Sequence, residues 1–536
     1  MSETLSPNCA EAAPPAARAR RTARLLPVLV PLTAALIAGF WGLDLGSHWD
    51  EHRRLASVHR TIDRGVLLPG MYWWPSMSYW LTLSSLAPEI IASQGPDVPR
   101  QETRAYLHRA VDSRRFLLRA RSVYMCVSAL SIVWVYLVVL VWRKTWFPAF
   151  IAASLVALSW EINYHMRWIA IDVVMMQFTA LTVLFAVLSR LKTPYRPWLY
   201  LAAVAAGCAC GSKYPAGLLI VLVLLAAYQR RERGTGLFPL ARLMLALCAV
   251  FGTTYVLITP GTILEPIEFV RGVRFNLDVY AQGHASHNVS PGLEHFWAIL
   301  KFFGVALFSK YDGIAIFLSL LGIAGIYALV RESRQMAVLM LCMPALYIAY
   351  FSTQRVLIVR NLLLLAPFFA IFSALGIEFL WKTWKNKAWR AAIACAVTGV
   401  LVVNGWWLFY AADTVTDRGS DRFIREAVAY VDQHADTRFF VSKRVADDFA
   451  ALGGAEPANV TRDMAAADQA LFYTKEGFVD AEVDWRKDVP GNFMTDVATW
   501  FGPYEINWLL YTKWPTNERI ALMSTATVAR LDLKLP

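Results

Sequence analysis

Charged residues are scarce in this chain. Asp, Glu, Lys and Arg make up 17% of its 536 residues, whereas 57% are hydrophobic and the mean hydropathy is +0.42. A soluble domain with so few charges would not stay dispersed in water. The scarcity therefore excludes an ordinary soluble protein and predicts a polytopic membrane protein.

Cysteine and internal repetition are also limited. Of the seven cysteines, Cys9 lies in the N-terminal tail and the other six lie within or beside apolar runs. A disulfide framework needs cysteines in outward segments, so none is implied. No tandem repeat is visible, which counts against a transporter because transporters usually carry related halves.

Positive charge prevails in the whole chain but not in every part of it. The net charge is +12. From Asp413 to the end there are 14 Lys and Arg against 20 Asp and Glu, so this part carries 14 − 20 = −6 and the remainder +12 + 6 = +18. The cations lie in short clusters between apolar runs. This is the positive-inside pattern of a membrane protein rather than the footprint of a nucleic-acid-binding protein.

Apolar runs of roughly 18 residues or more predict about 11 transmembrane helices. The expected spans are about 25–43, 119–141, 146–163, one from Asp172 to Arg190, one ending near Lys213, one from Pro215 to the RRERG cluster, one ending near Pro260, and about 312–330, 336–352, 359–381 and 388–410. On this topology every Arg and Lys cluster falls on the cytoplasmic side, and the C-terminus lies outside.

The same reading gives the domain organisation. Residues 1–24 are expected to form a disordered cytoplasmic tail, and residues 25–412 a transmembrane catalytic domain with large outer loops at 44–118 and 260–310. Residues 413–536 contain FIREAVAYVDQH with helical spacing and the strand-like TRFFVSK. The expected fold is therefore an all-α polytopic membrane protein with a small C-terminal α/β domain outside the membrane.

Several ionisable residues fall at the outer ends of the expected spans, where they are costly and usually functional. Arginines in such places also snorkel toward lipid headgroups, which is the alternative interpretation for Arg355 and Arg360. Lys213, between two spans, has less structural reason to be there. The set is Asp50, Glu51, Arg53, Asp172, Lys213, Arg355 and Arg360.

Five segments resemble, in order, those of membrane glycosyltransferases of the C-type superfold (GT-C), over about residues 25–410. They are DEHRRLASVHRTIDRGVLLPGMYWWPSMSYWL, HMRWIAIDVVMMQFTAL, GSKYPAGLLIVL, TPGTILEPIEFVRGVRFNLDVYAQGHA and QRVLIVRNLLLLAPFFAIF. The chain is most similar to the bacterial branch that uses polyprenyl-phosphate sugars, which includes aminoarabinose and galacturonic acid transferases and is related to protein O-mannosyltransferases.

The resemblance implies an inverting glycosyl transfer. A polyprenyl phosphate is a leaving group that needs cations rather than a general acid. The acceptor hydroxyl must lose a proton as it attacks the anomeric carbon. In the family the first acidic residue of the outer loop accepts that proton, which in this chain is Asp50, followed by Glu51.

Further roles are implied by the matched positions. Arg53, three residues after Asp50, shares its helical face and is expected to hold Asp50 ionised or touch phosphate; a solvated interface helix is the alternative. Asp172 is expected to support the acceptor or a divalent cation, with a helix cap as the alternative. The donor phosphate is expected at Lys213, Tyr214, Arg355 and Arg360, with His284 and His287 as further candidates for phosphate or metal.

One departure from the family leaves the metal unknown. Aminoarabinose transferases have a Glu-Lys pair where this chain has Trp73 and Trp74 before Pro75. A divalent cation, Mg²⁺ or Mn²⁺, stays open as a cofactor. The two indoles are interpreted either as an interfacial aromatic belt or as a sugar-stacking platform.

Two other function classes stay open at this stage. A transporter or lipid-sugar flippase would also have many spans, and a structural subunit would bind a partner through its C-terminal domain. The favoured interpretation is an enzyme of the bacterial inner membrane, with a polyprenyl-phosphate-linked sugar as donor and a lipid, glycan or protein as acceptor.

The charge clusters make the topology testable. A reporter fused after Pro536 or inserted near Gly283 should report the outer compartment, and one near Arg231 the cytoplasm. Alkaline phosphatase and fluorescent-protein fusions would measure this. A cytoplasmic C-terminus would contradict the arrangement of eleven spans.

Overall fold

The computed structural model describes most of the chain. The described residues are 23–45, 48, 50–95, 98–231, 236–283, 288–416, 422–452, 457–473, 499–501, 520–531, 533 and 535.

Seven helical segments in the described part are long and apolar enough to cross a membrane, so the chain is an integral membrane protein. Each coincides with an expected span. They are α7 (Arg114–Arg143), α10 (Ile171–Leu191), α13 (Leu237–Ile258), α17 (Asp312–Glu332), α18 (Arg334–Ser352), η3 with α19 (Val359–Leu365 and Ala366–Thr383) and α20 (Lys387–Thr416).

The other four expected spans are helices that are shorter or broken. The third is bent by 62° between α8 (Trp146–Leu158) and α9 (Trp160–Met166). The first is η1 with α2 (Leu26–Val28 and Leu29–Trp41), the fifth is α11 (Arg196–Ser212), and the sixth is η2 with α12 (Tyr214–Leu218 and Leu219–Gln229). Residues 167–170 after α9 and Lys213 before η2 are not helical, and both places border the site described below.

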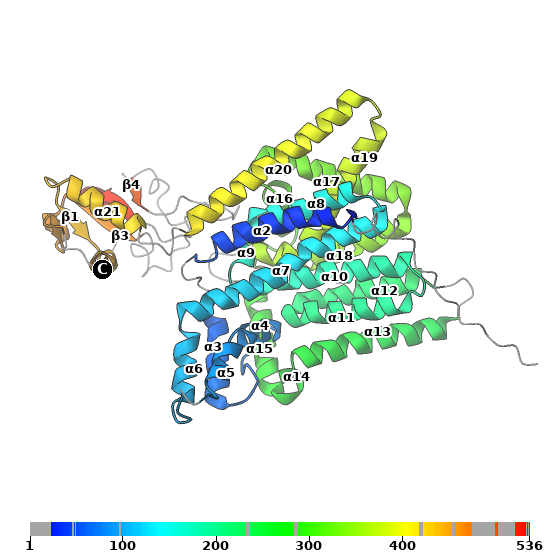
Figure 1. Ribbon diagram of the computed structural model, residues 1–536, viewed down its shortest axis with the longest axis horizontal. Coiled ribbons are helices and arrows are strands. Elements are labelled where there is room, and N and C mark those ends of the chain that lie inside the picture. The colour runs from blue at the N-terminus through cyan, green and yellow to red at the C-terminus, as the bar shows by residue number, and fades with distance from the viewer. Residues whose placement is uncertain are drawn as a thin grey trace, which may run out of the picture.

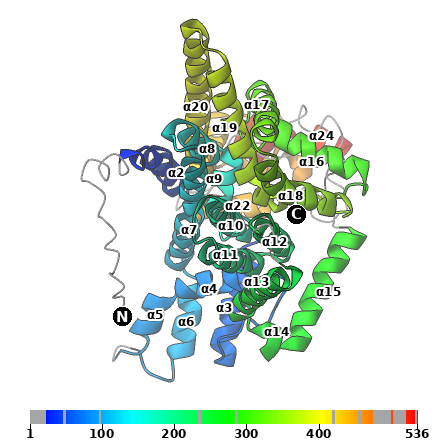
Figure 2. The ribbon, with the colours of Figure 1, turned by 90° about the vertical axis from the view of Figure 1, so that its right-hand side faces the viewer.

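Short helices gather at one end of this bundle, called the loop end from here on (Figure 1). The first long loop forms α3 (His52–Arg64), α4 (Met77–Ser84), α5 (Ala87–Ala92) and α6 (Thr103–Val111). The second forms α14 (Gly261–Leu264), α15 (Pro266–Gln282) and α16 (Leu293–Val305). Figure 2 shows that α15 runs along one side of the bundle, apart from α13.

The two loops are joined by a carboxylate. The phenol of Tyr72 donates to Oε2 of Glu265 at 2.5 Å, and Arg64 donates to the other oxygen of Glu265. Burial favours the neutral carboxyl, but these hydrogen bonds outweigh it and lower the pKa of Glu265. The first loop is thereby held against the start of α15.

The C-terminal part contains the expected α/β unit. Its five strands lie in the order β2-β1-β3-β5-β4, with α21 (Arg422–Gln433), α22 (Lys443–Ala451) and α24 (Thr525–Arg530) alongside. The strands are β1 (Phe439–Val441), β2 (Val460–Thr461), β3 (Gln469–Tyr473), β4 (Thr499–Phe501) and β5 (Ile520–Ser524).

Parallel and antiparallel pairs occur in the same sheet. Strand β1 is parallel to β2 and β3, and β5 is antiparallel to β3 and β4. Alternate residues of β3 face opposite cores: Leu471 and Tyr473 pack in the cluster that includes Val445 of α22, and Ala470 and Phe472 pack in the cluster that includes Val528 of α24. Helix α20 continues to Thr416, so the sheet unit begins later than residue 413.

Helices α17 and α19 pack very closely because glycines face each other. A Cβ at Gly376 would collide with the carbonyl oxygen of Leu321, and one at Gly325 with the carbonyl oxygen of Phe372. Close approach of backbones through small residues is a common way for membrane helices to associate.

Gly376→Ala should therefore force α17 and α19 apart and destabilise the protein by about 1–3 kcal/mol, the usual cost of overpacking. The thermal midpoint in detergent measures this. Gly399→Ala in α20 is the control, since a Cβ there meets no atom within 4 Å. Equal midpoints for the two variants would contradict the close packing.

Candidate active site at the loop end

The acidic pair Asp50-Glu51 stands at the start of α3. Glu51 is the residue before the first turn of this helix, and the helix ends at Gly65, which has a left-handed φ of 62°. Carboxylates are favoured at a helix N-terminus because the unpaired N–H groups there carry partial positive charge. Both acidic side chains are nevertheless buried, at 2% and 3% exposure, so each needs partners.

Glu51 has partners on both of its oxygens. Arg121 of α7 donates from Nε to Oε1 at 2.9 Å and from Nη2 to Oε2 at 2.6 Å. The backbone N–H of Ile169 also donates to Oε1, at 3.0 Å. This bidentate pair is fully buried on the arginine side. Glu51 is therefore saturated and holds the loop to the bundle.

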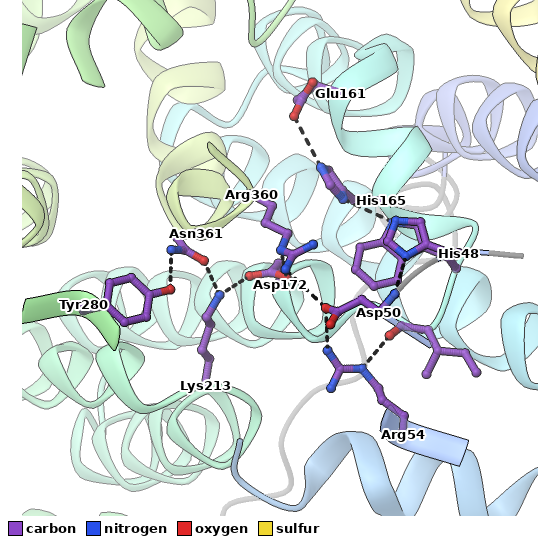
Figure 3. Close-up of polar contacts among 12 residues, drawn as sticks. His48, Asp50, Arg54, Glu161, His165, Asp172, Lys213, Tyr280, Arg360 and Asn361 are labelled. Carbon is purple, nitrogen blue, oxygen red and sulfur yellow. Dashed lines mark hydrogen bonds and ion pairs between the residues drawn. The ribbon is translucent and has the colours of Figure 1, made fainter. Parts of the chain in front are cut away.

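Asp50 is bound differently. Nη2 of Arg54 and Nη2 of Arg360 both approach its Oδ2, at 3.4 Å and 3.2 Å (Figure 3). Within the described part of the chain, Oδ1 of Asp50 accepts no hydrogen bond. The two oxygens of this buried carboxylate thus differ in their contacts within the described residues.

A second carboxylate adjoins the first through Arg360. Nε of Arg360 lies 3.6 Å from Oδ2 of Asp172, at the start of α10. Oδ1 of Asp172 accepts from the ammonium of Lys213, which follows α11. Figure 3 shows Arg360 between the two aspartates.

The chain of contacts continues to the second outer loop. Lys213 also donates to Oδ1 of Asn361, whose Nδ2 donates to the phenol oxygen of Tyr280 in α15 at 2.6 Å. Burial raises the pKa of Tyr280 to about 12, so its phenol stays protonated at neutral pH. Elements from five regions of the sequence thus meet in one polar cluster.

The structure brings together four of the candidate residues, Asp50, Asp172, Lys213 and Arg360. Tyr214 lies next to them and donates to the backbone oxygen of Tyr72 at 2.8 Å. Arg355 is exposed, and its backbone N–H donates to Tyr280 while its carbonyl oxygen accepts from Val289. His284 and His287 lie outside the described residues.

Arg53 does not share the Asp50 contact. Its guanidinium lies over Trp73, 4.9 Å from the ring centroid, whereas Arg54 pairs with Asp50 and lies 4.2 Å from the centroid of Trp74. Both spacings can bring side chains together on a helix, and in the structure it is Arg54 that pairs with Asp50. Trp73 and Trp74 therefore support arginines.

Sequence reasoning also missed partners that are distant in the chain. Arg121 and Tyr280 gave no signal, because one reads as a span end and the other as a loop aromatic. Asn361 follows Arg360 in QRVLIVRNLLLLAPFFAIF, one of the five segments that resemble the GT-C family. Its polar side chain at membrane depth was a usable signal.

The carboxylates at this site do not suit a divalent cation. Asp50 faces Arg54 and Arg360, and Asp172 faces Lys213 and Arg360. Three cationic side chains would repel Mg²⁺ or Mn²⁺, which prefer uncompensated oxygen ligands. In the described residues no group of three His, Cys, Asp or Glu side chains is arranged to hold a metal ion.

Comparisons with known proteins agree with the motif resemblance in one respect. Residues 115–259, from α7 to α13, match the family model of dolichyl-phosphate-mannose-protein mannosyltransferases. This segment contains Asp172 and Lys213. The match confirms the resemblance to the GT-C superfamily and supports a glycosyltransferase. No curated protein sequence matches the chain.

Two solved structures are similar to this chain at low identity. ArnT from Cupriavidus metallidurans bound to undecaprenyl phosphate has 13% identity and a TM-score of 0.48, over 94% of this chain and 98% of that one. The archaeal oligosaccharyltransferase AglB from Archaeoglobus fulgidus, in complex with an inhibitory peptide and a dolichol-phosphate, has 13% identity and a TM-score of 0.41, over 78% and 63%.

Glu51→Ala should destabilise the protein by about 3–5 kcal/mol, because it leaves the buried Arg121 without its counterion. Glu268→Ala, which breaks the exposed pair with Arg271, is the control, and surface pairs contribute about 0–1 kcal/mol. Thermal midpoints of both purified variants provide the comparison. Similar midpoints would mean that Glu51 does not anchor the loop.

Proposed function

We propose that the protein is an inverting glycosyltransferase that moves a sugar from a polyprenyl-phosphate donor to a hydroxyl group at the outer face of the membrane. The observation that carries this proposal is the contrast within the acidic pair. Both oxygens of Glu51 are occupied, whereas Oδ1 of Asp50 is left beside a cluster of cations. A carboxylate in this state is suited to accept a proton.

Charge supports a phosphodiester donor. The ion-paired cluster has three positive charges, on Arg54, Arg360 and Lys213, and two negative charges, on Asp50 and Asp172. Its net charge is therefore 3 − 2 = +1. A polyprenyl-phosphate sugar carries one negative charge at neutral pH. Its binding would bring the cluster to neutrality in a partly dry environment, where complementarity counts most.

The reaction needs few groups. The acceptor oxygen attacks the anomeric carbon and forms the new glycosidic bond, while its proton passes to Oδ1 of Asp50. The bond from the anomeric carbon to the phosphate oxygen breaks, and its electron pair leaves with polyprenyl phosphate. Arg360 and Lys213 hold the charge that develops there. Attack from the side opposite the phosphate inverts the anomeric centre.

The membrane setting suits such a donor. Lys213 follows the end of α11 and Asp172 begins α10, so both lie where spans end. A lipid-borne phosphate and a water-borne acceptor meet at that depth. We place this end at the outer face of a bacterial inner membrane, on the strength of the Arg and Lys clusters at the opposite span ends. The acceptor would be a lipid, a glycan or a protein.

Transfer can be tested directly. Purified protein is incubated with polyprenyl-phosphate sugars and candidate acceptors, and products are identified by mass spectrometry. Asp50→Asn keeps size and most hydrogen bonding, so folding and donor binding should survive while single-turnover transfer falls roughly 10²–10⁴-fold, the usual contribution of a positioned base.

Asp63→Asn provides the matched control. Asp63 lies on the same helix, α3, but its carboxylate is exposed and contacts His108 at 2.8 Å. This variant should transfer sugar at the normal rate. Normal transfer by Asp50→Asn would show that Asp50 is not the base. If the unaltered protein transfers no sugar from any class of donor, the proposed glycosyltransferase activity is wrong.

A further inference from the structure

The link between α9 and α10, residues 167–170, is not helical, and its backbone contacts Glu51 and Arg54, the arginine that pairs with Asp50. The N–H of Ile169 donates to Glu51, and its carbonyl oxygen accepts from Nε of Arg54 at 2.8 Å. A shift of this link would therefore move residues on α3. Asp172 follows the link directly.

Trp168 is the large side chain of this link, and it is fully buried. The imidazole of His48 stacks on its indole, with centroids 3.8 Å apart and planes at 10°. The guanidinium of Arg360 lies over the same ring system, 5.4 Å from its centroid. One indole thus contacts a cation of the site and a residue just before Asp50.

Two residues of α9 fix the orientation of this indole. Nε1–H of Trp168 donates to Nδ1 of His165 at 3.3 Å, so that nitrogen carries no proton. The proton of the neutral imidazole must then sit on Nε2, which faces Oε1 of Glu161 at 3.3 Å. Glu161 and His165 are both 3% exposed. A buried carboxylate that fixes the tautomer of a histidine also fixes what that histidine binds.

We propose that Trp168 is a positioning residue that sets Arg360 and Asp50 relative to each other, with Glu161 and His165 holding its indole. It reaches Asp50 by two routes. One runs through Arg360, which contacts Oδ2 of Asp50, and the other through His48, whose Nδ1 accepts the backbone N–H of Asp50 at 3.3 Å. The inference rests on the proposed glycosyl transfer.

A double-mutant cycle between Trp168 and Arg360 tests this. Trp168→Met fills much of the space with a flexible apolar chain but provides no flat ring. It should slow single-turnover transfer roughly 10–100-fold, because small misplacements of catalytic groups have effects of this size. In an Arg360→Lys background, where the planar guanidinium is already gone, the same change should slow transfer less than about 3-fold.

Trp160→Met is the matched control. Trp160, in α9, is also buried and supports an arginine, Arg167, whose Cζ lies 4.6 Å from the ring centroid. Its effect should be the same in both backgrounds, since Arg167 does not contact the aspartates. Trp168→Phe keeps a ring but loses the N–H, and it should restore transfer to within about 5-fold of normal.

The outcome is decided by the coupling. If Trp168→Met slows transfer equally with Arg360 intact and in the Arg360→Lys background, Trp168 only stabilises the fold and the inference is wrong. If Trp168→Met does not fold, the same cycle with Trp168→Phe decides, with an expected loss of about 3-fold that must vanish in the Arg360→Lys background.

Binding of undecaprenyl phosphate separates this inference from the proposed function. Its dissociation constant should rise about 10-fold in Trp168→Met and less than about 2-fold when the change is made in Arg360→Lys. This readout needs no transfer. If binding shows the coupling but Asp50→Asn transfers sugar normally, Asp50 is not the base, and the role of Trp168 still stands. If neither binding nor transfer shows the coupling, the role of Trp168 is wrong, and the proposed function is unaffected.

Discussion

The buried ion pair between Glu51 and Arg121 is the contact on which the arrangement of the loop end depends. Arg121 also donates from Nη1 to the carbonyl oxygen of Leu43 at 3.1 Å, just beyond the end of α2. One arginine of α7 therefore holds the end of α2, the start of α3 and, through Glu51, the link at Ile169. Such a pair is costly to desolvate and is retained only when its hydrogen bonds are all made. Here they are, and they fix where Asp50 lies.

Asp50 and Asp172 share Arg360 as an ion-pair partner. A buried carboxylate needs such partners, because burying an unpaired charge is costly. Arg54 and Lys213 complete the compensation from opposite sides. The cluster is stable without a ligand, yet one positive charge is left over. In the proposed function, this surplus would attract the donor phosphate to a site that has already formed.

Aromatic faces allow this surplus of positive charge. Trp73 and Trp74 lie under Arg53 and Arg54, at positions where aminoarabinose transferases have a Glu-Lys pair. An indole attracts a guanidinium without neutralising it. The same holds for Trp168 beneath Arg360. Aromatic rings thus orient three arginines of the chain, two of which, Arg54 and Arg360, are also paired with Asp50.

The sequence by itself determined where the helical segments lie and which charged residues stand at their ends. Apolar runs must be helical in a bilayer because every backbone N–H and C=O has to be satisfied internally, so the helical segments followed from hydropathy. Asp50, Asp172, Lys213 and Arg360 stood out because charge at membrane depth is rare. Arg121, Tyr280 and the Trp168 contacts were decided only by the tertiary structure. Their partners lie far away in the chain, and a buried arginine reads in sequence like any span end. Whether a carboxylate is saturated, as in Glu51, or open, as in Asp50, depends on where those distant donors arrive, and that is set by helix packing.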